Sequence, residues 1–451
     1  MKAVIDVYRR ALESGEFDDF ASLYDAGARL EVSIPGARHL VDGPAGAWAE
    51  LADLWPTPGR LLEFSPQQHE HGFALWLERL GDDGRGHRQR QYIHLNDGAI
   101  SGHWIYGARP SHPEIVPPDQ QGPLAPPELF EQVGGRPVEQ GVLVSTGWSG
   151  NRIESATLAD GRRLICKRIV PGAGWLERLS EDRGREGLLF VEGILQRFPA
   201  SVDPTIIAAL FDGEAWWIAM RDVSAHLFGA EGPLTRKQNQ LVLGAANEMW
   251  KTFWGERHDI LAPQANRIGM CAPSIAEAER DSDDFLPKQL EACWEAFAEA
   301  VDDDVAEAIL AVLENPAPLA AEIEKHGTTL IHGDLRDEQI GLDGERLVVV
   351  DWGSATQGHP VVELGWYMMH DVWRFEATHD EVVEDFRRAR GDDDDPEAVE
   401  LGMISGLTMY GWILGHSAVV HTDEAERAWA REELDWWVPR VRRALETWSP
   451  A

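Results

Sequence analysis

The sequence predicts an α+β protein in two parts, and three observations lead to this prediction. Residues 1–108 begin with helical periodicity and continue as short alternating strands separated by turn residues. A proline-rich segment over residues 109–128 then interrupts all regular patterning. The remainder changes from strand-rich (129–223) to helix-rich (224–451), which predicts a sheet lobe followed by a helical lobe.

Composition limits the classes of function. The formal charge of −36 argues against a nucleic-acid-binding surface. No segment approaches the roughly 18 apolar residues of a membrane span, and the first residues have no apolar signal-peptide core. An odd number of widely spaced cysteines indicates a reducing compartment without a disulfide framework or a cysteine-based zinc site. We therefore expect a cytoplasmic protein with neither nucleic-acid nor membrane partners.

The acidity itself has two interpretations. An acidic field around a cleft would concentrate a cationic substrate. A well-solvated surface accounts for the same charge, and runs such as Asp302–Asp304 and Asp392–Asp395 fit exposed turns better than metal sites.

In the first part, apolar spacing predicts three helices and five strands. Tyr8 and its neighbours lie on one face of the first helix, and Asn96-Asp97-Gly98 is a hairpin-turn signal. The expected helices cover residues 3–12, 17–24 and 45–54, and the expected strands cover 28–34, 61–65, 72–79, 88–95 and 100–106. The seven prolines that follow between residues 108 and 128 predict a semi-rigid linker.

The second part opens with strands. A Gly/Ser loop containing Gly147, Ser149 and Gly150 separates the first two. In the third, residues 163–169, Lys167 points to the face opposite Cys166 and Arg168. A helix is expected over residues 181–198, followed by a buried strand over 215–220 and a hinge over 221–223. Further helices are expected at 236–255, 287–300, 304–313, 318–326 and within 362–448.

The segment His332–Gln339 and the triplet Asp351-Trp352-Gly353, which begins twelve residues later, are the most informative stretch. Between them, Asp343-Gly344 indicates a tight turn, and the apolar run after it indicates a buried strand. A hairpin here would bring Gln339 and Asp351 to neighbouring strand ends, within reach of one divalent ion.

These residues resemble the H-x-D-x-x-x-x-N and D-x-D/G motifs of the aminoglycoside phosphotransferase and choline-kinase-like family, whose fold is related to that of protein kinases. The segment Gly358–Leu364 loosely matches the one that follows in the family. Gln339 stands where most members have Asn. Its amide oxygen remains a hard ligand, although the extra methylene shifts its reach by about 1.5 Å.

The resemblance implies ATP- and Mg-dependent phosphoryl transfer to a hydroxyl of a small molecule. Asp334 would accept or orient the acceptor proton, and Arg336 would neutralise the migrating group. Gln339 and Asp351 would hold magnesium, and His332 would fix the loop.

The resemblance also implies where the nucleotide binds. Lys167 would position its phosphates, with Glu186 or Glu192 as the partner of the lysine. Glu186 is preferred because it follows a basic residue early in the helix, as in the family. The adenine would meet the hinge between Met220 and Val223, and the phosphates would meet the loop at Gly147, Ser149 and Gly150.

The first part is similar to SnoaL-like, nuclear-transport-factor-2-like cone domains. Such a cone can bind a ligand, catalyse acid–base chemistry or form a homodimer, and its candidate residues are Asp19, Tyr24, Tyr92, His94 and His103. His69-Glu70-His71 lacks a third ligand, so no metal site is expected there.

Two other functions stay open. The kinase-like part could be a pseudokinase scaffold, with Gln339 as the sign of decay, or the cone could be the working isomerase or cyclase. Within the kinase interpretation, the acceptor could be an aminoglycoside-like antibiotic, an amino sugar or a choline-like metabolite.

Overall fold

The computed structural model describes residues 1–34, 37–55, 58–69, 72–81, 86–96, 98–108, 124–143, 151–228, 233–280, 286–371, 374–421 and 424–449. These residues form two compact units, one over Met1–Leu124 and one from Ala125 onward. The strands that contain Gly141–Leu143 and Arg152–Glu154 belong to a sheet of the second unit.

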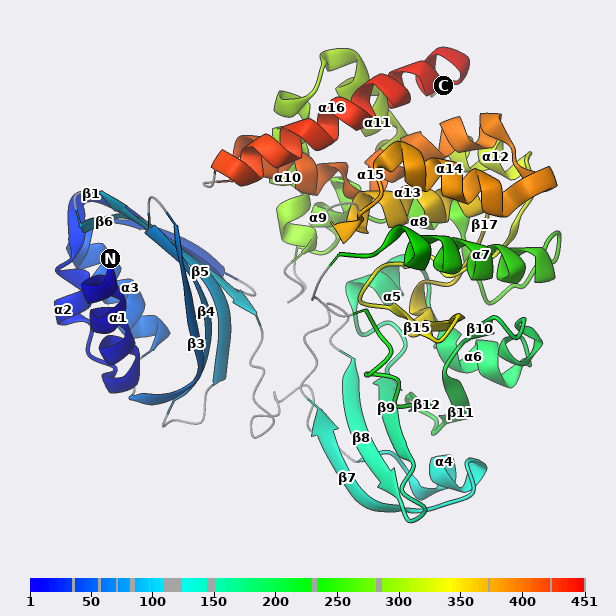
Figure 1. The fold of residues 1–451 in the computed structure, drawn as a ribbon, viewed down its shortest axis with the longest axis horizontal. Helices are drawn as coiled ribbons and strands as arrows, with labels where there is room; N and C mark the ends of the chain where they lie inside the picture. Colours follow the sequence, from blue (N-terminus) through cyan, green and yellow to red (C-terminus); the bar gives the residue numbers. More distant parts are fainter. Residues whose placement is uncertain are drawn as a thin grey trace. The chain divides into compact units, whose positions relative to one another are not determined.

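The first unit packs helices on a six-stranded sheet. Its strand order is β2-β1-β6-β5-β4-β3, and neighbouring strands pair antiparallel except for the parallel pair of β1 with β6. The elements are α1 (Lys2–Ser14), α2 (Asp18–Ala21), β1 (Tyr24–Ile34), β2 (Ala37–Asp42), α3 (Gly43–Leu54), β3 (Gly59–His69), β4 (Gly72–Gly81), β5 (Gly86–Asn96) and β6 (Ala99–Ala108). Figure 1 shows the helices on one face of this curved sheet, where Tyr8, Phe20 and Trp55 are fully buried.

The second unit begins with a sheet lobe. Its five strands have the order β11-β12-β9-β8-β7, and α4 and α6 both pack against β11 and β12. The elements are α4 (Pro127–Gln132), β7 (Pro137–Leu143), β8 (Arg152–Leu158), β9 (Arg163–Ile169), α5 (Trp175–Leu179), α6 (Arg185–Val191), β10 (Val202–Asp203), β11 (Ile206–Phe211) and β12 (Trp216–Arg221). The last residues of the expected linker begin α4, because proline fits the first position of a helix.

The helix expected over residues 181–198 is wrong in length. Only Arg185–Val191 is α-helical, and a 3₁₀ turn follows at Leu195–Arg197. Gly184 has a φ of 91°, and a Cβ there would lie 1.9 Å from the Trp216 ring. The helix therefore starts late because the indole from β12 packs directly against the backbone at its N-terminus.

The helical lobe surrounds the long helix α15, which packs against α10, α13 and α16. Its helices are α7 (Arg236–Thr252), α8 (Gln264–Ile268), α9 (Ser274–Ala278), α10 (Leu290–Ala300), α11 (Asp303–Glu314), α12 (Ala317–Glu324), α13 (Pro360–Asp371), α14 (His379–Arg390), α15 (Pro396–Val419) and α16 (Glu424–Thr447). A Cβ on Gly365 would lie 2.8 Å from the Gly402 carbonyl oxygen, so α13 and α15 approach closely because both positions are glycine.

Two small sheets lie next to the segment His332–Gln339 and the residues that follow it. They have the orders β10-β16-β15 and β13-β17-β14 and are formed by β10 together with β13 (Ala262–Pro263), β14 (Thr329–Ile331), β15 (Ile340–Asp343), β16 (Arg346–Val349) and β17 (Thr356–Gly358). The predicted α+β class, with a sheet lobe followed by a helical lobe, is confirmed. Among the described residues, no helix has the length and apolarity needed to cross a membrane.

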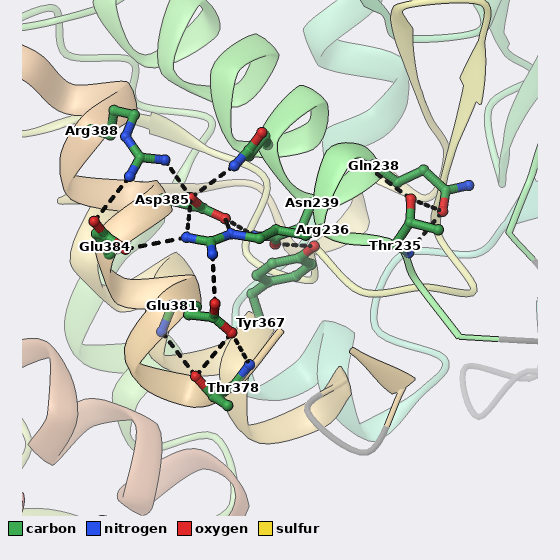
Figure 2. A network of polar contacts seen from close by, with 11 residues as sticks. Thr235, Arg236, Gln238, Asn239, Tyr367, Thr378, Glu381, Glu384, Asp385 and Arg388 are labelled. Atoms are coloured by element: carbon green, nitrogen blue, oxygen red, sulfur yellow. Dashed lines mark hydrogen bonds and ion pairs between the residues drawn. The ribbon is translucent and has the colours of Figure 1, made fainter. Parts of the chain in front are cut away.

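A polar network joins α7 to α14 (Figure 2). The Asp385 carboxylate is fully buried and accepts hydrogen bonds from Arg236, Arg388, Asn239 and Gln240. Both helices also begin with capping boxes, Thr235 with Gln238 and Thr378 with Glu381. The network fixes the two helices to each other at their polar faces.

We expect Asp385→Ala to lower the free energy of unfolding of the second unit by about 2 kcal/mol, because it leaves the buried Asn239 amide without its acceptor. Glu384→Ala is the matched control: it bonds the same two arginines, but its side chain is 61% exposed. That change should cost no more than about 0.5 kcal/mol. Urea unfolding measures both, and equal losses would contradict the role of burial.

Candidate active site

The site is built on the hairpin of β15 and β16. The two strands pair antiparallel, with Ile340 opposite Val349, and the Val350 N–H donates to the Gln339 carbonyl oxygen at 2.9 Å. This register brings the side chains of Gln339 and Asp351 together, with 3.5 Å between Gln339 Nε2 and Asp351 Oδ2. The predicted hairpin is therefore present, and its strand ends hold both predicted metal ligands.

Lys167 connects the sheet lobe to this hairpin. Its ammonium nitrogen donates to Glu186 Oε1 at 2.5 Å and to Asp351 Oδ1 at 2.7 Å. The lysine comes from β9, Glu186 from the first turn of α6, and Asp351 from the end of the hairpin. Glu192 lies exposed at the end of α6.

Burial and charge act in opposite directions on this cluster. Burial alone would lower the pKa of Lys167, but the Asp351 and Glu186 carboxylates outweigh it and hold that pKa above its ordinary value. Burial raises the pKa of Glu186 to about 8, against the pull of Lys167. For Asp351, the lysine charge overcomes burial and lowers the pKa, so its carboxylate is ionised.

Glu363 of α13 holds the backbone of the loop that contains Asp334. Its buried carboxylate accepts the backbone N–H groups of His332 and Gly333, both at 2.7 Å. Burial raises the pKa of Glu363, against these hydrogen bonds. Gly333 has a φ of 80°, and a Cβ there would lie 2.0 Å from the Ser354 carbonyl oxygen, so only glycine fits.

His332 is a structural residue, as the sequence predicts. It is fully buried, its Nε2 lies 3.0 Å from the Val350 carbonyl oxygen, and its Nδ1 accepts the Asp334 N–H at 3.2 Å. The Trp352 ring packs edge-on against it with centroids 4.6 Å apart. Both ring nitrogens are therefore committed to the backbone.

The loop that begins at Asp351 is strained and anchored. Asp351 has φ 62° and ψ 65°, a left-handed conformation that L residues rarely adopt outside functional sites. Arg185 of α6 donates to the Gly353 carbonyl oxygen, to Ile260 at 3.0 Å and to Ser180 at 3.1 Å. The guanidinium therefore fixes the peptide chain just beyond Asp351.

Asp334 lies against the guanidinium of Arg336. Arg336 Nε lies 3.3 Å from Asp334 Oδ2, and the guanidinium also pairs with the exposed Glu338. Burial would lower the pKa of Arg336, but these two carboxylates raise it overall. Next to them, Asp337 forms a buried ion pair with Arg374.

The other predicted nucleotide contacts divide into two groups. Gly147, Ser149 and Gly150 lie outside the described residues. Met220 and Val223 are buried at the end of β12 and just after it. The chain then pairs with the catalytic hairpin, because the Phe228 N–H donates to the Ile340 carbonyl oxygen at 3.1 Å.

Three arginines near the site do not follow from the sequence pattern. They are Arg185, Arg267 and Arg374. All three are buried. A buried arginine is unusual enough to be a signal, but burial at these positions is not visible in the local sequence pattern.

In the first unit, two of the five candidates meet. Tyr24 Oη bonds His103 Nδ1, and His103 Nε2 lies 3.0 Å from Gln91 Oε1, which also accepts from Tyr8 at 2.7 Å. Asp19 is exposed, whereas Tyr92 is buried and His94 is half-buried. His69 lies at the end of β3, while Glu70 and His71 lie outside the described residues.

Within the described ranges, no group of three or more His, Cys, Asp or Glu side chains could hold a metal ion. The three cysteines are buried thiols.

A model of the "Phosphotransferase enzyme family" matches residues 258–401, which include the catalytic loop and the metal-binding loop. The match confirms the predicted resemblance and the predicted enzyme class, a phosphotransferase. The SnoaL-like resemblance of the first unit stays a prediction. No curated protein matches the chain.

Solved structures give weak matches. An aminoglycoside phosphotransferase from Alicyclobacillus acidocaldarius is 12% identical, with 72% of this chain and 96% of that chain covered and a TM-score of 0.40. A spectinomycin phosphotransferase in complex with ADP and spectinomycin is 13% identical, with 72% and 99% covered and a TM-score of 0.41. A putative fructosamine-3-kinase from Thermobifida fusca is 16% identical, with 71% and 97% covered and a TM-score of 0.35.

The buried His103 predicts acid sensitivity of the first unit. Burial lowers the pKa of His103 to about 3, whereas the unfolded imidazole titrates near 6.5. The unfolded state therefore binds the extra proton, and stability is lost as the pH falls below about 6.5. Between pH 6.5 and pH 5, we expect the free energy of unfolding to fall by about 2 kcal/mol less in His103→Gln than in the wild type. Urea titrations of both proteins at the two pH values measure this, and identical pH dependence would contradict it.

Proposed function

We propose that this protein transfers the γ-phosphoryl group of ATP to a hydroxyl group of a small molecule, with magnesium as cofactor. The observation that carries the proposal is the contact of Lys167 with both Glu186 and Asp351, beside the loop of Asp334. It joins a phosphate-binding cation to a metal ligand at the end of the hairpin that begins just after the catalytic loop.

The donor chemistry fits magnesium. Asp351 supplies an ionised carboxylate and Gln339 an amide oxygen, which are hard ligands of the kind that Mg²⁺ binds. The Gln339 amide now presents its nitrogen to Asp351 Oδ2, so its oxygen would face the ion after a half-turn of the amide group. Phosphate oxygens and water would complete the coordination. Once bound, magnesium would screen the phosphate charges and fix their positions.

Lys167 would then hold the phosphates while Glu186 keeps its ammonium group in place. Lys167 contacts Asp351 through Oδ1, which leaves Oδ2 of the same carboxylate for the metal. The raised pKa of Lys167 keeps it charged for this purpose.

Asp334 would orient the acceptor hydroxyl and accept its proton. As the acceptor oxygen bonds to the γ-phosphorus, the bond from that phosphorus to the ADP oxygen breaks and ADP leaves. Arg336, 3.3 Å from Asp334, would offset the charge on the migrating group. Because Glu363 and His332 hold the loop backbone, Asp334 keeps its place throughout.

We expect Asp334→Asn and Asp351→Asn each to lower turnover by about a thousandfold. They should differ in nucleotide binding: Asp334→Asn should bind Mg-ADP like the wild type, whereas Asp351→Asn should not. ADP release across a panel of hydroxylated metabolites and antibiotics measures turnover, and calorimetry measures binding.

Asp343→Asn is the matched control, because Asp343 lies on the same hairpin but is 58% exposed. It should leave both quantities unchanged. Mg-dependent nucleotide binding without turnover on any acceptor would favour the pseudokinase, and unchanged turnover in Asp334→Asn would refute the role of that carboxylate.

A further inference from the structure

Arg267 is a buried arginine for which the described part of the chain offers no carboxylate in contact. It lies in α8, it is 5% exposed, and its Nε and Nη2 atoms have no hydrogen-bond partner among the described residues. Its Nη1 lies against the Met270 sulfur. A guanidinium that stays charged and unpaired in the interior is costly, so such groups normally meet a carboxylate or carbonyl oxygen.

The two unpaired nitrogens share one edge of the guanidinium plane. Nε–H and one N–H of Nη2 are parallel donors, the arrangement that binds both oxygens of a carboxylate or phosphate. The other edge is the one covered by Met270.

A second unpaired donor lies beside it. The Arg267 guanidinium carbon sits 4.1 Å from the centroid of the Trp366 ring, and Trp366 is 8% exposed. The indole Nε1 is also buried without a partner among the described residues. The arginine and the tryptophan thus present three buried N–H-bearing atoms that lack an acceptor.

Arg267 and Trp366 lie near the loop that contains Asp334. Glu363 and Trp366 are one turn apart on α13, so the helix that holds the loop backbone also carries the tryptophan. Arg267 is near enough to Asp334 and Glu363 for their charges to raise its pKa, although burial lowers it overall. The half-buried His370 and Tyr410 rings continue the cluster from Trp366, with centroids at 5.3 and 5.9 Å.

We infer that the unpaired edge of Arg267, with Trp366, binds an oxyanionic group on the acceptor, a carboxylate or a phosphate ester. This inference rests on the proposed function, because it places the acceptor beside Asp334. It reverses the expectation from net charge, since a cationic acceptor would meet a buried cation at this position.

Calorimetry with matched probes in the presence of Mg-ADP tests the inference. Gluconate, galacturonate, glycerate and glucose-6-phosphate are the anionic probes, and glucose, galactose, glycerol and glucosamine are their neutral or cationic counterparts. We expect at least one anionic probe to bind, and its neutral counterpart to bind more weakly. Arg267→Met should weaken the anionic probe about a hundredfold, and Arg267→Lys, which keeps the charge but loses the paired donors, about tenfold.

Arg280→Met is the matched control, because Arg280 is exposed and pairs with the equally exposed Glu277. It should leave binding unchanged. The thermal midpoint of Arg267→Met should not fall, since the change removes unpaired buried donors, whereas a purely structural arginine would destabilise the protein when lost.

Several outcomes would overturn the inference. They are binding of the neutral or cationic probes at least as tightly, anion binding that survives Arg267→Met, and no binding of any anionic probe at millimolar concentration. Weaker binding of Mg-AMP-PNP but not of Mg-ADP in Arg267→Met would assign the edge to the γ-phosphate instead. If the wild-type protein does not bind Mg-ADP, the proposed function itself is rejected, and this outcome is distinct from those that concern Arg267.

Discussion

The site depends on one buried ammonium group. Lys167 is 5% exposed, and a charge at that depth is stable only when carboxylates surround it. Its two partners come from different elements, Glu186 from α6 and Asp351 from the loop after β16. The ammonium charge of Lys167 is therefore balanced only when the sheet lobe, α6 and the hairpin are correctly placed relative to one another. Arg185 supports the same arrangement, because it joins α6 to the carbonyl group of Gly353.

The sequence predicted the parts of this site that are encoded locally. The hairpin follows from a turn dipeptide and a β-branched run. The preference for Glu186 over Glu192 follows from the family resemblance, in which the glutamate stands early in the helix after a basic residue. The length of α6 did not follow, because Trp216 is distant in sequence and fits against Gly184 only in the folded chain. Strand β2 was missed for a related reason: it is held by backbone pairing with β1 rather than by an alternating apolar pattern. The SnoaL-like origin of the first unit remains a prediction.

Comparison among the buried arginines shows why Arg267 differs from its neighbours. Arg374 has the carboxylate of Asp337 and Arg185 has three carbonyl oxygens, so each charge is stabilised within the fold. The guanidinium of Arg267 packs on the Trp366 ring and contacts the Met270 sulfur at one edge. Its Nε and Nη2 donors have no acceptor among the described residues. The fold supplies acceptors for its other site arginines but none, among the described residues, for two donors of Arg267. We therefore infer that a ligand supplies the missing acceptor. That conclusion could not come from the sequence, since it depends on which donors lack partners.

The net charge of −36 and an anionic acceptor are compatible once distance is considered. At physiological ionic strength, exposed charges are screened over about 8 Å, so the acidic surface acts weakly on a group already inside the site. Inside, Lys167, Arg336 and Arg267 supply buried or half-buried cations beside the carboxylates of the site, and screening by water is small there. Phosphoryl transfer needs such cations to offset the charge that develops on the migrating group. An acceptor that adds another negative charge needs one more cation, and Arg267 is a buried cation to which no carboxylate of the described residues is hydrogen-bonded.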